Sequence, residues 1–136
     1  MSHISTCGTT FNCKDSIREA AQALGLEIVD AKTFVTYGGQ QDSCDFKMVI
    51  PGNSTAYECG FVRNEDDTFD LQYDSYSKGK GMMEKIGANA GRFEAEYKYS
   101  RTKRALRAKG TRFREERKVG ADGRMKRRLI ARVRGR

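Results

Sequence analysis

Arginine and lysine crowd the last part of the chain. Of the 26 basic residues, sixteen lie between positions 101 and 136, against three of the 18 acidic residues. This segment therefore has a net charge of +13, and residues 1–100 have a net charge of −5. Arginine outnumbers lysine there, and a planar guanidinium can hold a phosphate through two parallel hydrogen bonds. The pattern predicts a polyanionic partner, either nucleic acid or an acidic protein surface, with a merely solubilising surface as the third interpretation.

The candidate phosphate-binding residues span a helical stretch and two β-like runs after it. They are Arg101, Arg104, Arg107, Arg112, Arg114, Lys126, Arg128, Arg132 and Arg134. Tyr97 and Tyr99 come just before them, and a tyrosine ring at that position can stack on a base or pack in the core. We include Tyr99 among the candidate nucleic-acid-binding residues.

Four cysteines and the single histidine, His3, are the residues that could bind a metal or act as a nucleophile. The cysteines, at positions 7, 13, 44 and 59, contain no Cys-x-x-Cys pair, the close spacing that structural zinc sites normally use. We expect four reduced and mostly buried thiols, with zinc or a disulfide as the alternatives. His3 is expected to bond locally at a strand edge, and Cys7 near His3 is the best dyad that the spacing offers.

Two short stretches imitate known sites. Residues 78–81 read Lys-Gly-Lys-Gly, but the phosphate-binding loop motif needs a glycine where Asp74 stands and a serine or threonine directly after Lys80. We expect a flexible loop there. Residues 65–67 are three adjacent acidic side chains that could bind a cation, although such turns are usually solvated. The sequence thus predicts no catalytic residue, no metal site and no cofactor, in a protein that is not an enzyme.

Two elements open the chain. Residues 3–11 are rich in β-branched and small polar types, which predicts a strand. A helix follows, capped by Asn12 or Asp15, because apolar side chains at 17, 20, 21 and 24 fall on one helical face. From 26 to 74 the apolar period is two, and glycine-rich or proline-containing turns separate the segments. This pattern favours an antiparallel meander with one solvated face.

Helical spacing returns over residues 82–109. Beyond it, the runs 112–119 and 124–133 are joined by Gly-Ala-Asp-Gly at 120–123, which is typical of a hairpin loop. Apolar and basic residues alternate in the second run, so we expect a folded hairpin at one edge of the sheet rather than a disordered arm.

These elements predict one α+β domain over residues 1–136. Its antiparallel sheet would be packed by two helices in the order β-α-β-β-β-β-α-β-β, with a basic helix and hairpin over 98–136. No run of about 18 apolar residues exists, which argues against a membrane span. The first residues lack the apolar stretch of a secretory signal, so we expect a cytoplasmic protein. No particular oligomeric state is indicated.

Several motifs occur in an order that resembles a known family. Residues 1–5 read Met-Ser-His-Ile-Ser, 57–61 read Tyr-Glu-Cys-Gly-Phe, 69–74 read Phe-Asp-Leu-Gln-Tyr-Asp, 97–99 read Tyr-Lys-Tyr, and 122–123 read Asp-Gly. They resemble Met-Ser-His-Phe-Ser, Tyr-Asp-Ile-Gly-Phe, Tyr-Glu-Leu-x-x-Asp, Tyr-Ala-Tyr and Asp-Gly of the hypothetical chloroplast frame thirty-five family (domain of unknown function twelve-fifty-seven), found in cyanobacteria, plastids, other bacteria and phages. The resemblance covers nearly the whole chain and implies a shared fold. The cysteine at 59, the stretch 78–81 and the arginine-rich end depart from it.

The leading functional hypothesis is a non-enzymatic accessory module that binds RNA or DNA through the arginine-rich helix and hairpin. One alternative is an adaptor that docks on an acidic protein partner. The resemblance implies an AAA-type ATPase as that partner, because members of the family have been suggested to work beside such ATPases. The other alternative is a small nucleotide-binding protein whose basic pocket grips a phosphate.

Overall fold

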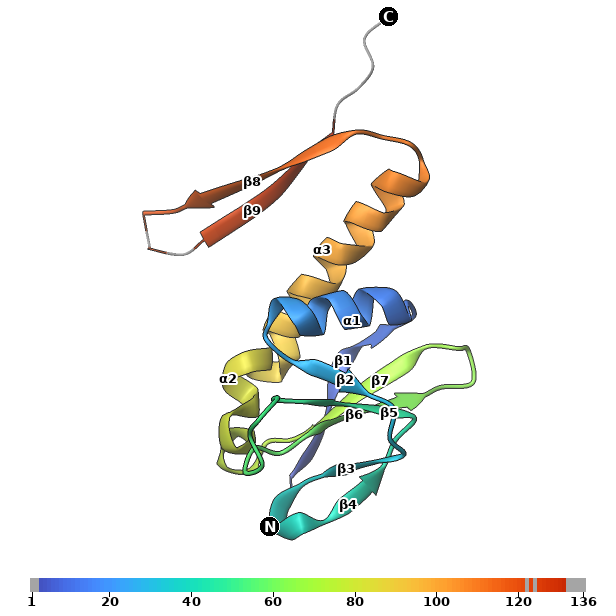
Figure 1. The fold of residues 1–136 in the computed structure, drawn as a ribbon, viewed down its shortest axis with the longest axis vertical. Coiled ribbons are helices and arrows are strands. Elements are labelled where there is room, and N and C mark those ends of the chain that lie inside the picture. Colours follow the sequence, from blue (N-terminus) through green and yellow to red (C-terminus); the bar gives the residue numbers. More distant parts are fainter. Residues whose placement is uncertain (1–2, 122, 124, 132–136) are drawn as a thin grey trace, which may run out of the picture. The chain divides into compact units, whose positions relative to one another are not determined.

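The computed structural model describes residues 3–121, 123 and 125–131, and its α+β fold class is the one predicted (Figure 1). Where the sequence predicted one domain, the structure divides into two compact units, residues 1–98 and 99–136. Within the described residues, no helix combines the length and the apolar character needed to cross a membrane.

The first unit is built on a five-stranded antiparallel sheet. In spatial order the strands are β1 (Ile4–Phe11), β7 (Phe69–Asp74), β6 (Cys59–Arg63), β5 (Phe46–Val49) and β2 (Glu27–Val29). Strands β5, β6 and β7 follow one another as neighbours, as the predicted meander requires. β3 (Thr33–Val35) and β4 (Gln41–Ser43) form a separate hairpin. The sequence did not predict β4, because Gln-Asp-Ser carries no apolar residue.

The sequence predicted that the second face of the sheet would be solvated, but part of this face is covered. In β6 the side chains of Cys59 and Phe61 are buried with the helices, so Gly60 faces the other way. The ring of Phe34, from β3, lies against Gly60 so closely that an added Cβ would come within 2.3 Å of it. Only glycine permits this approach. The β3–β4 hairpin therefore covers part of the face opposite α1 (Figure 1).

Helix α1 (Lys14–Ala23) buries the predicted face, since Ile17, Ala20 and Ala21 have almost no exposed surface. The predicted caps are wrong. Cys13 occupies the N-cap position, and its side chain makes no capping hydrogen bond. At the entrance to the helix, the backbone N–H groups of Asn12 and Cys13 donate instead to the hydroxyl of Tyr97.

The long second helix is divided, in contrast to the single element predicted over 82–109. α2 (Met82–Ile86) and α3 (Gly91–Ala108) are separated by the short 3-10 segment η3 (Ala88–Ala90). Gly87 has a φ of +83°, and a Cβ there would lie 2.8 Å from the backbone nitrogen of Arg92. A side chain at this position would collide with the start of α3, so the break depends on glycine. The buried stripe persists across the break, with Met82, Ile86 and Phe93 in the core.

The second unit contains the end of α3, from Tyr99 onward, and the predicted hairpin. Its strands are β8 (Phe113–Val119) and β9 (Met125–Ala131). The hairpin is confirmed, but its expected place at an edge of the main sheet is wrong. β8 and β9 pair only with each other among the described residues, as a sheet of two strands.

Candidate nucleic-acid interface

In the second unit, Tyr99 contacts cations from both the helix and the hairpin. Its ring projects from α3 and is half-buried. The guanidinium of Arg127, on β9, lies 4.2 Å from the ring centroid, and the ammonium of Lys103 lies 4.9 Å from it. Cation–π contacts of this kind are worth about 0.5–1 kcal/mol each at exposed sites. The ring therefore links the helix to the hairpin, and a base could stack on it only by displacing a cation.

Glu115 adds a second link between helix and hairpin. Its carboxylate pairs with the Lys103 ammonium at 3.3 Å. Burial alone would raise the pKa of the Glu115 carboxyl, but the nearby Tyr99 hydroxyl and the positive charges of Lys103 and Arg117 outweigh burial and hold the pKa below its ordinary value. Burial and the negative charge of Glu115 raise the pKa of Tyr99. Tyr99 therefore stays protonated and Glu115 stays charged at neutral pH.

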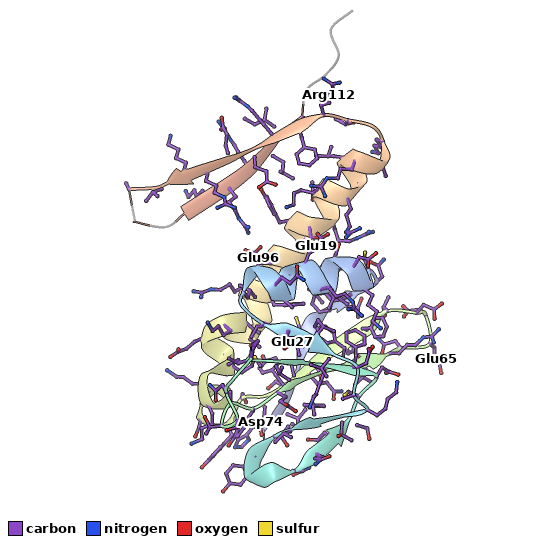
Figure 2. The ribbon with its side chains drawn as sticks, viewed as in Figure 1. Glu19, Glu27, Glu65, Asp74, Glu96 and Arg112 are labelled. Carbon is purple, nitrogen blue, oxygen red and sulfur yellow. The ribbon has the colours of Figure 1, made fainter. Side chains whose placement is uncertain are left out.

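The turn from α3 into β8 carries an open depression. It has a volume of about 430 Å³ and is lined by Thr111, Arg112, Phe113 and Arg114. The Arg107 guanidinium lies 5.5 Å from the centroid of the Phe113 ring. Arg112, labelled in Figure 2, is exposed beside this depression. Arg112, just before β8, and Arg114, within it, both line the depression, which suits contact with phosphates.

The face of the hairpin that carries Arg114 holds one small ion-pair network. Glu116 accepts from the Arg128 guanidinium at 2.6 Å, and Arg114 approaches its other carboxylate oxygen at 3.3 Å. Arg128 lies directly opposite Glu116 in the strand register. The two guanidinium groups are largely exposed and Glu116 is half-buried, so the pairs contribute little to stability. One carboxylate serves two guanidinium groups, and the network keeps a net positive charge.

The strand register also brings like charges together. Arg117 lies directly opposite Arg127, and Lys118 lies directly opposite Lys126. Side chains at directly opposed positions of an antiparallel pair are about 4.5–5.5 Å apart at Cβ, and like charges there are destabilising. Two neighbouring positions of the hairpin therefore each set one cation opposite another, one pair on each face of the hairpin.

The structure places the predicted contact residues on the second unit with different exposures. Arg101, Arg107, Arg112, Arg114, Lys126 and Arg128 are exposed, and Arg104 is half-buried. Arg132 and Arg134 lie outside the described residues. Sequence reasoning omitted Lys118 and Arg127 from the candidates, although the predicted loop at 120–123 already implied their cross-strand partners. Tyr97, the other tyrosine considered for stacking, is a core residue with 6% of its surface exposed.

The other candidate sites do not assemble. Cys7 donates a weak hydrogen bond to the carbonyl of Asn89, while His3 stacks on Tyr76. His3 directly precedes β1 and Cys7 lies within it, so the two are about 13 Å apart along the extended chain and form no dyad. Cys7, Cys44 and Cys59 are buried, as predicted, and Cys13 is half-buried. No group of three or more histidine, cysteine or acidic side chains suited to a metal ion occurs within the described ranges.

The acidic turn at 65–67 is satisfied by its own neighbours. Asp66 accepts from the hydroxyl of Thr68 at 2.6 Å and from its backbone N–H at 3.2 Å. These two bonds lower the pKa of Asp66. Asp67 pairs with Arg63. Two of the three carboxylates of the turn thus already have partners within the turn and its neighbouring residues, which does not favour a cation site.

Comparison with models of known protein families, with curated proteins and with solved structures finds no match to this chain. The resemblance to the chloroplast frame family therefore stays a prediction, and the functional argument depends on the site itself.

Proposed function

We propose that this chain is a non-enzymatic accessory module that binds RNA or DNA through the basic surface of its second unit. The exposed candidates of that surface are Arg101, Arg107, Arg112, Arg114, Lys118, Lys126 and Arg128. The observation that carries the proposal is the strand register of the hairpin, which sets Lys118 opposite Lys126 and Arg117 opposite Arg127. A polyanion between or beside such cations would relieve their repulsion.

A surface that served only solubility would not need this arrangement. Solubility requires net charge, which interspersed charges of both signs supply without opposing cations across a ladder. In this unit, sixteen basic residues face three acidic ones. Two of the three, Glu115 and Glu116, are engaged with cations of the same unit. The unit therefore keeps an excess of positive charge that can meet phosphates, which are spaced along a nucleic-acid backbone closely enough to contact several residues at once.

The salt dependence of binding tests this proposal. If about five phosphates are neutralised, the plot of log K against log salt for a single-stranded oligonucleotide should be linear, with a slope of roughly −3 to −4. A triple variant, Arg112→Gln, Lys118→Gln and Lys126→Gln, should weaken binding to all sequences alike and flatten the slope by about 2.

The matched control removes three exposed cations from the first unit, through Arg18→Gln, Lys32→Gln and Lys85→Gln. It changes the net charge of the protein equally and should leave the slope almost unchanged. If both variants behave alike, nonspecific net charge explains the binding. If the parent binds no nucleic acid at low salt, the acidic-partner adaptor becomes the leading function.

A further inference from the structure

Three aromatic side chains from distant parts of the first unit meet at its surface. The His3 ring stacks on the Tyr76 ring, with 5.9 Å between centroids, and Tyr37 meets Tyr76 edge to face at 4.7 Å. His3 and Tyr37 are exposed, and Tyr76 is half-buried. Tyr37 keeps 41% of its surface in solvent, whereas Phe11, Phe61 and the other phenylalanines of the core cluster are almost or wholly covered. These rings form a surface cluster outside the core.

One buried carboxylate holds the backbone of all three aromatic residues. Asp74, labelled in Figure 2, is 1% exposed. Its oxygens accept the backbone N–H groups of His3 at 3.0 Å, Tyr37 at 3.0 Å and Tyr76 at 2.9 Å. Because three segments bind one acceptor, the backbone from which each ring projects is held in place. A pre-organised set of rings loses little entropy when a planar ligand stacks on it.

A strained turn places two cations directly after Tyr76. From Ser77 to Lys80, every residue has a left-handed conformation, with φ between 48° and 67°. Three of these four residues are not glycine, and such residues rarely adopt this region. The turn is tied down because the N–H of Tyr57 donates to the carbonyl of Gly79 at 3.0 Å. Such strain in a fixed turn is typical of functional sites.

Lys78 and Lys80 are exposed on this turn. Among the residues that the structure describes, neither ammonium group forms an ion pair or a hydrogen bond. The apolar surface of the unit is also concentrated nearby: Ile4, 42% exposed, lies opposite Asp74 in the register of β1 and β7. Rings, an aliphatic side chain and two available cations thus come together around a single buried carboxylate.

We propose that this cluster binds a nucleotide, with the base stacked on the exposed ring of Tyr37, beside Tyr76 and His3, and the phosphate on Lys78 and Lys80. A π-face accepts any base, because stacking does not depend on the pattern of hydrogen-bond donors. A lysine ammonium holds a phosphate as a point charge. The site differs from the phosphate-binding loop that the Lys-Gly-Lys-Gly sequence imitates, since no helix of sufficient length follows the turn. It lies in the first unit and does not depend on the proposed role of the hairpin.

The experiment is a titration of the ¹⁵N-labelled full chain, followed by amide resonances, with four probes. The probes are AMP, adenosine, inorganic phosphate and an octamer of adenylate. AMP should shift the resonances of Tyr37, Tyr76 and residues 78–80, and should bind more tightly than adenosine or phosphate alone. The octamer is compared with AMP in the hairpin triple variant (Arg112→Gln, Lys118→Gln and Lys126→Gln), at the resonances of Tyr37, Tyr76 and residues 78–80. Octamer binding there that is at least tenfold tighter than AMP binding identifies the ligand as a strand, and equal affinity identifies it as a free nucleotide.

Variants separate the two halves of the site. Tyr37→Leu should weaken AMP binding at least tenfold, while Tyr37→Phe, which keeps the ring, should bind like the parent. Lys78→Gln with Lys80→Gln should weaken AMP about tenfold and leave adenosine unchanged. These side chains are exposed, and the spectra themselves report folding.

Three results would overturn the proposal. The first is that neither AMP nor the octamer shifts these resonances at millimolar concentration. The second is that the lysine double variant binds AMP as tightly as the parent. The third is that the hairpin triple variant, with Arg112, Lys118 and Lys126 replaced, loses AMP binding, because the ligand would then sit on the second unit. A failure of the hairpin to bind nucleic acid leaves all three readouts intact, so the two proposals fail separately.

Discussion

The hydroxyl of Tyr97 donates a hydrogen bond to the side-chain oxygen of Asn12 over 2.8 Å. The same hydroxyl oxygen accepts the backbone N–H groups of Asn12 at 2.9 Å and of Cys13 at 3.1 Å. Tyr97 lies on α3, and Asn12 and Cys13 connect β1 to α1. The first N–H groups of a helix and the residues before it lack partners within the helix itself. Tyr97, 84 residues from Cys13, accepts the backbone N–H groups of Asn12 and of the N-cap residue Cys13, and so fixes the chain where it enters α1.

Tyr97→Phe should therefore destabilise the protein although it preserves the ring. The variant keeps the packing of the ring on Phe11, 4.8 Å between centroids, and loses three hydrogen bonds. Water can replace some of them, because Asn12 is exposed, so we expect a loss of about 1–2 kcal/mol in the free energy of unfolding. Denaturant titration measures it. The control, Tyr37→Phe, removes an exposed hydroxyl and should change stability by less than about 0.5 kcal/mol.

Asp74 predicts a pH dependence of stability. Burial alone would raise the pKa of this carboxyl, but the backbone N–H groups of His3, Tyr76 and Tyr37 outweigh it and lower the pKa below the ordinary value. A depressed native pKa contributes stability above the unfolded-state pKa, near 3.9, and this contribution is lost as the pH falls through the native value.

Asp74→Asn should be less stable than the parent by about 1–3 kcal/mol at neutral pH, because an amide nitrogen would face one N–H donor. The difference in the free energy of unfolding between the variant and the parent should become smaller as the pH is lowered from about 5 to 2. Urea unfolding at several pH values measures both quantities. Glu65→Gln, in an exposed turn, is the control and should run parallel to the parent. A gap that stays constant with pH would contradict the proposed role of the charge.

The cysteines should differ sharply in reactivity. Cys59 has no exposed surface, and burial first, with the charge of Glu58 second, raises the pKa of its thiol. The thiolate is the reactive form, so Cys59 is shielded both sterically and chemically. In the native protein, iodoacetamide at pH 8 should modify half-buried Cys13 at least tenfold faster than Cys59. Mass spectrometry of digests follows each site. Unfolding in guanidinium should make all four react alike, and a persistent difference there would contradict burial as the cause.

Local patterns of the sequence predicted most of the elements, because they depend on neighbouring residues. The apolar spacing of Ile17, Ala20 and Ala21 defines a helix face without reference to the rest of the chain. The break before α3 was missed because a single glycine, Gly87, does not by itself predict a helix end, and Ala90, which also has a positive φ of 59°, gives no sequence signal for that conformation. The covering of Gly60 by Phe34 was missed for a related reason. It joins residues that become neighbours only when β3 folds back over β6.

The sequence predicted which segment carries the candidate interface, but it did not predict how the side chains are arranged there. The count of arginines identified the segment, but Tyr99 could not be assigned from its position on the helix. Its role depends on Arg127, which reaches its ring from a strand after the turn. The cluster at Asp74 shows the limit most clearly, because no local sequence pattern links His3, Tyr37 and Tyr76, which meet only where the Asp74 carboxylate binds their backbones.

The opposed lysines predict effects of opposite sign on stability and on binding. Lys118 lies directly across from Lys126, so Lys118→Gln should relieve a repulsion and Lys118→Glu should replace it with an attraction. Cross-strand charge pairs are worth about 0.2–1 kcal/mol. We expect the amides of β8 and β9 to exchange with solvent fastest in the parent, more slowly in Lys118→Gln and most slowly in Lys118→Glu. Hydrogen exchange followed by NMR reports each strand separately.

The same series should weaken nucleic-acid binding in the same order. Each charge lost from the contact surface removes a released counterion, so the salt slope should flatten by roughly 0.7 for Lys118→Gln, and by more for the charge reversal. Lys85→Glu, on α2 of the first unit, makes the same change in net charge and is the control. It should alter neither the exchange of the hairpin amides nor the salt slope. A Lys118→Glu protein that is more stable in its hairpin and binds as tightly as the parent would show that the repulsion serves no polyanion, and would remove the main support for a nucleic-acid partner.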